Sequence, residues 1–104
     1  MTRHSKCLDL SMAQVDDLKC IIIDAADSGY GDKMLTAHKF ARRLMDLTMF
    51  RTRINDAFRG TTASKRQQVA CLEGIINTMI GDGLLTHGHK TIDVARSKDS
   101  VPAA

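Results

Sequence analysis

The chain has 104 residues, a length that fits one domain with a single hydrophobic core. Hydrophobic residues make up 43% of it and charged residues 26%, a balance that excludes an intrinsically disordered protein. The net charge is +3, and the apolar run Cys20–Ile23 is far too short for a membrane span. Since no signal-peptide pattern follows Met1, we expect a cytoplasmic protein that does not enter a membrane.

A first helix is predicted from Ser11 onward. The segment Ser11–Gln14 is a capping box, and Leu10 and Val15 are spaced as a hydrophobic staple. Apolar residues then recur every three or four positions, at Val15, Leu18, Ile22 and Ala25. Gly29 and Gly31 are expected to end this helix.

A second, long helix is predicted with Asp32 as its N-cap, Phe58 near its end and Gly60 as its stop. One apolar row, interrupted by Arg51, consists of Ala37, Phe40, Leu44, Leu47, Ile54 and Phe58. A second apolar edge consists of Met34, Ala41, Met45 and Met49. Together they cover about half of the circumference, whereas a helix packed on one side needs an arc of about 100°. We therefore expect another chain to cover part of this helix.

A third helix follows a second capping box, Ser64–Gln67. Its apolar stripe consists of Val69, Leu72, Ile76, Met79 and Ile80. Gly81 or Gly83 is expected to end it. Residues 84–94 fit either a short hairpin that turns at Gly88 or a loop with a last helical turn.

These elements predict an all-α fold, a three-helix antiparallel arrangement with one long central helix, and a homodimer. The single helical domain is expected to span residues 11–96, between a flexible N-terminus (1–10) and a disordered tail (97–104). The predicted core and dimer positions are Phe40, Leu44, Leu47, Ile54, Phe58, Leu72, Ile76 and Met79.

No group of residues predicts catalysis, so we expect neither an enzyme nor a bound cofactor or metal. His87 and His89 lack a third ligand, and Asp24 and Asp27 fit a solvated helix face better than a cation site. The cysteines match no zinc pattern. Cys20 and Cys71 are expected to be reduced and packed, and Cys7 is a candidate for a disulfide between subunits.

Charge and surplus apolar surface predict a protein that binds another protein. Residues 11–28 hold four aspartates and one lysine, whereas residues 29–60 hold seven basic residues and three aspartates. These regions are expected to complement each other within the fold or across a dimer, and a basic surface for nucleic acid is the rival interpretation. The expected partner-binding residues are Met45, Met49, Phe50 and Arg51.

One alternative is a winged-helix DNA-binding regulator. Lys65, Arg66, Gln67 and Gln68 would begin the recognition helix, and residues 83–94 would form the wing. Three features oppose it. The helix before it is long instead of short, the recognition helix is about a turn too long, and the wing carries only Lys90 and two histidines as cations.

The segment from Gln67 to Ile76, with the preceding connector Arg59–Thr62, resembles the closing part of small bacterial quorum-sensing antiactivators of the TraM and QslA kind. The resemblance covers residues 32–80. It implies a helical homodimer that binds a LuxR-type transcription factor and blocks its engagement of DNA. Our first expectation is therefore a non-enzymatic antiactivator in quorum-sensing control, with a transcription factor as its partner and without direct nucleic-acid binding.

Overall fold

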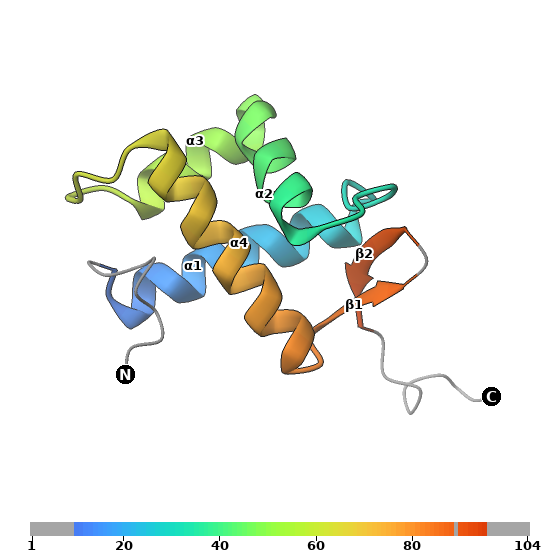
Figure 1. The fold of residues 1–104 in the computed structure, drawn as a ribbon. Coiled ribbons are helices and arrows are strands. Elements are labelled where there is room, and N and C mark those ends of the chain that lie inside the picture. Colours follow the sequence, from blue (N-terminus) through green and yellow to red (C-terminus); the bar gives the residue numbers. More distant parts are fainter. Residues whose placement is uncertain (1–9, 89, 96–104) are drawn as a thin grey trace.

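The computed structural model describes residues 10–88 and 90–95, which form four helices followed by a β-hairpin (Figure 1). The elements are α1 (Met12–Asp27), α2 (Ala37–Asp46), α3 (Thr48–Ala57), α4 (Lys65–Gly81), β1 (Leu85–Gly88) and β2 (Thr91–Val94). The prediction of a mostly helical fold is confirmed. The predictions for Cys7, His89, the N-terminal nine residues and the tail lie outside the described residues.

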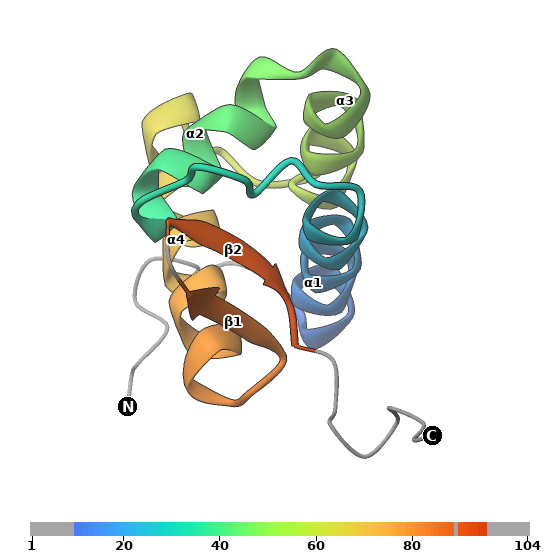
Figure 2. The same cartoon turned by 90° about the vertical axis from the view of Figure 1, so that its right-hand side faces the viewer.

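The helices form two layers. α2 packs against α4 and α1 packs against α3, and Figure 2 shows these pairs on opposite sides of the molecule. The hairpin closes one end, where β1 contacts α4 and β2 contacts α1. Each connection between successive helices therefore passes from one layer to the other, and the hairpin links the two layers again.

α1 begins as predicted. The Ser11 hydroxyl accepts a hydrogen bond from the Gln14 amide, and the Gln14 side chain accepts one from the Ser11 amide. Gln14 also donates to the Ala57 carbonyl at 2.9 Å, which fixes the end of α3 against the start of α1. Leu10 and Val15 pack against the core, as expected of a hydrophobic staple.

The predicted long helix is wrong, because the structure divides it at Leu47. This residue has φ −97° and ψ 118°, an extended conformation between α2 and α3. The first half also starts later than predicted, since Thr36 is its N-cap and accepts from the Lys39 amide at 3.1 Å. Because Leu47 is extended, the apolar row predicted along one helix does not continue from α2 into α3. Arg51, which interrupts that row in the sequence, lies in α3.

The break changes which side chains face inward. Phe50, predicted on the polar side, is 5% exposed and packs edge-on against Tyr30, with ring centroids 5.2 Å apart. Met45, predicted at the surface, is also buried. The chain therefore covers most of the apolar arc by itself, which removes our reason for expecting a dimer. The oligomeric state stays a prediction.

α4 confirms the second capping box, with the Ser64 hydroxyl accepting from the Gln67 amide. It ends at Gly81, and Gly83 follows with φ +84°. The Leu84 amide donates to the Met79 carbonyl at 2.8 Å, so the chain turns directly from the helix into the hairpin.

Residues 85–94 are a hairpin, one of the two predicted alternatives. Leu85 pairs with Val94 and Gly88 with Thr91 in antiparallel register. Asp32 forms a β-bridge with Thr91 instead of capping a helix, so this expectation is wrong. Next to it, the Ile92 amide donates to the Gly31 carbonyl at 3.0 Å. A side chain at Gly31 would collide with the Ile92 carbonyl, which explains why glycine occupies this position.

Most predicted core positions are confirmed as buried. They are Phe40, Leu44, Ile54, Phe58, Leu72, Ile76 and Met79. Leu47 is only half-buried, because it lies at the junction outside both helices. The prediction for the two helical cysteines is wrong in part. Cys20 is a free, exposed thiol, whereas Cys71 is buried but disulfide-bonded. Since disulfides are rare in the cytosol, the cytoplasmic location stays a prediction.

Candidate functional site

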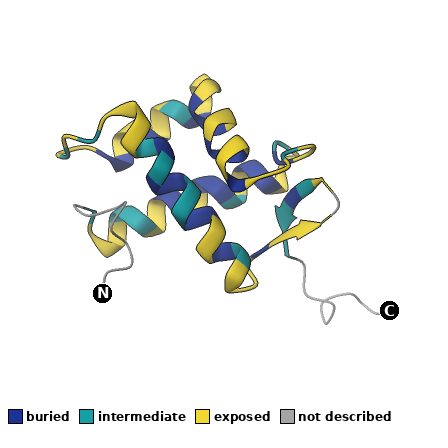
Figure 3. Ribbon diagram, viewed as in Figure 1, coloured by how far each residue is buried: buried dark blue, intermediate teal, exposed yellow. Residues whose placement is uncertain are grey.

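The outward face of α2 carries four cationic or titratable side chains. Its inward face is apolar, with Phe40 and Leu44 fully buried. The opposite face is exposed, and at 3.6 residues per turn its residues fall within an arc of about 140°. They are His38, Lys39, Arg42 and Arg43. Figure 3 shows the alternation of buried and exposed residues along this helix.

α4 extends this face. His38 Nδ1 lies 3.1 Å from Glu73 Oε1, which joins the exposed side of α2 to the middle of α4. Lys65 and Arg66 are exposed in the first turn of α4, where the capping box fixes the helix start. We call Lys39, Arg42, Arg43, Lys65 and Arg66 the basic surface.

Two arginines, one in α3 and one in the turn that follows it, have a different environment. Arg53 forms a salt bridge with Asp24 of α1 at 3.0 Å, and Arg59 forms one with Asp56 at 2.7 Å. The predicted complementarity between the acidic and basic regions is thus present within one chain, between α1 and α3. No residue of the basic surface forms a salt bridge with any residue that the structure describes.

The hairpin adds little charge to this site. Its turn region carries Lys90 with φ +64°, and His87 is exposed on β1. Asp93 on β2 offsets the lysine, so the hairpin has no net charge when histidine is neutral. The Thr91 hydroxyl donates to Asp32 at 3.0 Å, a contact that fixes the hairpin to the segment before α2.

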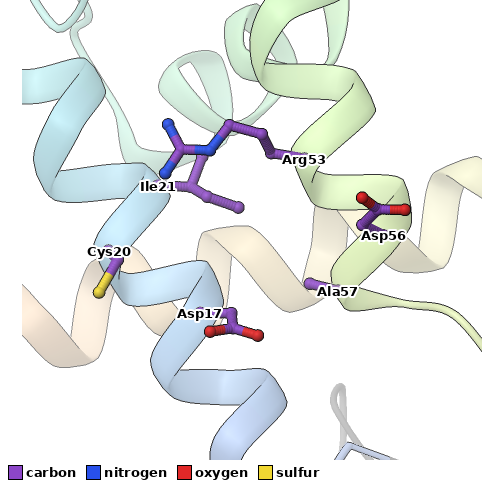
Figure 4. Close-up of a pocket in the computed structure, with 6 residues that line it drawn as sticks. All are labelled: Asp17, Cys20, Ile21, Arg53, Asp56 and Ala57. Carbon is purple, nitrogen blue, oxygen red and sulfur yellow. The ribbon is translucent and has the colours of Figure 1, made fainter.

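A pocket of about 230 Å³ lies between α1 and α3 (Figure 4). It is lined by Asp17, Cys20, Ile21, Arg53, Asp56 and Ala57. The guanidinium of Arg53 and the carboxylate of Asp56 already have partners of opposite charge. The side chains of Asp17 and Cys20 are therefore its polar groups that form no hydrogen bond or ion pair with a described residue. Within residues 10–88 and 90–95 no three His, Cys, Asp or Glu side chains are grouped to hold a metal.

The structure separates the predicted partner-binding residues. Met45 and Phe50 are buried, Arg51 is half-buried, and its guanidinium donates to the Thr48 hydroxyl at 3.3 Å. Met49 is exposed, at 51% of its surface. These four residues do not form one surface, so the predicted site is not assembled. The basic surface was not predicted as a unit, although the surplus of basic residues between 29 and 60 was its signal.

No known family, curated protein or solved structure matches the chain. The resemblance to quorum-sensing antiactivators therefore stays a prediction. Among the described helices, none has the length and apolar character needed to cross a membrane.

Proposed function

We propose that this protein is a DNA-binding domain of the winged-helix kind, which presents α4 and the basic surface to double-stranded DNA. The observation that carries the proposal is the passage from α4 directly into a hairpin whose second strand is bridged to Asp32, ahead of α2. In this proposal α4 is the recognition helix, the hairpin is its wing, and the segment at Asp32 adds a short bridge to the edge of the hairpin.

One of the sequence-based objections loses its basis in this fold. That objection was the long helix before the recognition helix. Both α2 and α3 have 10 residues, so short helices precede α4. The other two objections stand. α4 has 17 residues, and the hairpin has few cations.

Charge supports the same proposal. A protein that binds a duplex needs cations that are not already neutralised, because they replace the counterions of the phosphates. Lys39, Arg42 and Arg43 meet this requirement on α2, and Arg66 meets it on α4. On α4 the side chain of Asn77, a type that hydrogen-bonds to base edges, is exposed, whereas the Gln67 side chain accepts from the Ser64 amide in the capping box.

The test is fluorescence anisotropy of a labelled 20-bp duplex, titrated with the protein at several salt concentrations. We expect binding whose logarithm of affinity falls linearly with the logarithm of salt, with a slope of about −3 to −5 for four or five phosphate contacts. No binding at low salt would contradict the proposal.

The antiactivator function stays a prediction that rests on resemblance alone, since the exposed apolar arc that supported it is largely buried. Affinity capture from the native cell would test it. Recovery of a transcription factor together with failure of the DNA titration would favour it over our proposal.

A further inference from the structure

We infer that α2, and not the hairpin, is the main phosphate-binding element of this protein. The inference rests on the proposed function, because it names the surface through which the duplex is held. Lys39, Arg42 and Arg43 contact the phosphates, and Arg66 adds a contact from α4. The hairpin contributes little to the electrostatic part of the binding free energy.

The first argument is availability. Arg53 and Arg59 already interact with carboxylates at 3.0 and 2.7 Å, so a phosphate would have to compete with Asp24 and Asp56 for them. Arg42 and Arg43 have no such competitor among residues 10–88 and 90–95. Their side chains are free to meet a phosphate without breaking an existing ion pair.

The second argument is the exposed face of α4. After Lys65 and Arg66 in the first turn, the next charged residue along the helix is Glu73. The positions around and beyond it on the outward side are neutral and mostly small: Ala70, Gly74, Asn77, Thr78 and Gly81. Such a face permits close approach to a groove but offers no charge to phosphates, so α4 alone does not supply the electrostatic part of binding.

The third argument is the position of the carboxylates at the edges of α2. Glu73 lies beside His38 at the start of α2, and Asp46 is the last residue of that helix. Both repel phosphates. The favourable region therefore lies between them, over Lys39, Arg42 and Arg43, with the first turn of α4 packed in the same layer.

The hairpin lacks comparable features. Lys90 is its single Lys or Arg among the described residues, and Asp93 offsets this charge. A wing that contacts the DNA backbone would need basic side chains, but here these are on α2. The duplex is therefore expected to lie across α2 and the start of α4 and to leave the hairpin at its margin.

The experiment compares two variants that remove equal charge from different helices. Arg42→Gln/Arg43→Gln removes two unpaired arginines of α2. Arg53→Gln/Arg59→Gln removes two paired arginines, one in α3 and one in the turn after it, and is the matched control with the same net charge. We call it the α3 control. A third variant, Lys90→Gln, tests the hairpin. Circular dichroism checks that each variant folds, which we expect because all five side chains are exposed.

We expect the α2 variant to weaken binding of the 20-bp duplex at least about tenfold and to reduce the salt slope by about 2. The α3 control and Lys90→Gln should stay within about twofold of the unmodified protein. If the control or Lys90→Gln weakens binding as much as the α2 variant does, the inference is wrong while the proposed function survives. If the unmodified protein does not bind the duplex at all, both are wrong.

Discussion

The first and last helices in the chain, α1 and α4, differ from the two between them, α2 and α3, in how they begin and end. α1 and α4 are continuous over 16 and 17 residues, and each begins with a capping box that satisfies its own first amides. α2 and α3 have 10 residues each and meet at one extended residue, which gives α3 no side-chain cap. The bounds of the two long helices are therefore set by residues close in the sequence, whereas the division between α2 and α3 is set by the tertiary contacts of these helices.

Phe50 offers the strongest test of that dependence on packing. Phe50→Ala should reduce the free energy of unfolding by about 3–5 kcal/mol, because the side chain is buried and contacts Tyr30. Urea unfolding followed by circular dichroism measures the change. The neighbouring Met49→Ala is the control and should cost below about 0.5 kcal/mol, since Met49 is exposed. Equal effects of both substitutions would show that Phe50 is not enclosed.

A substitution at Gly31 tests the contact between β2 and the segment that connects α1 to α2. Gly31→Ala should destabilise the fold by about 2–3 kcal/mol, because the added methyl group collides with the Ile92 carbonyl. The control is Gly74→Ala in α4, where nothing lies within 4 Å of an added Cβ. That variant should be more stable than the unmodified protein by about 0.5–1 kcal/mol. Thermal melts of the two variants should therefore shift in opposite directions.

The capping boxes test the local character of α1 and α4. Ser11→Ala and Ser64→Ala should each cost about 1 kcal/mol of stability. Because the two caps are in different helices, their effects should add in the double variant. Chemical denaturation of the three variants measures this. A double variant as stable as either single one would mean that the caps are not independent.

The smallest effect is expected at the α2–α3 junction. Thr48 is the first residue of α3, a position at which proline is tolerated because its amide has no partner within the helix. Thr48→Pro should therefore cost under about 1 kcal/mol. In one continuous helix the same substitution would cost about 3 kcal/mol. A large loss of helical signal and stability would favour the prediction of one unbroken helix over the break at Leu47.

Part of this fold was predictable because its signals are local. Ser11, Gln14, Ser64 and Gln67 stand at capping-box spacing, and the apolar stripes that follow identify the inward faces of α1 and α4. The same periodicity could not reveal the break at Leu47. Apolar residues continue on both sides of it. The break accompanies contacts that are distant in the sequence, those of α3 with α1 and of Phe50 with Tyr30.

The candidate site was predictable only as an excess of charge. The sequence shows many arginines between residues 29 and 60, but not which of them are neutralised. That depends on the approach of α3 to α1, which sets Arg53 against Asp24. The sequence could not decide between a hairpin and a loop for residues 84–94 for a similar reason. The bridge between Asp32 and Thr91 joins segments that are far apart in the sequence.

The position of α1 has a consequence for how the molecule opens. In its first turn Gln14 donates to the Ala57 carbonyl, and β2 packs against α1. The Ile92 amide also donates to the Gly31 carbonyl, four residues after the helix ends. Fluctuations that free the hairpin must therefore disturb the same helix that anchors α3. In native-state hydrogen exchange, the amides of the strands, of the α3 terminus and of the centre of α1 are expected to exchange with one common opening free energy, as a single cooperative unit.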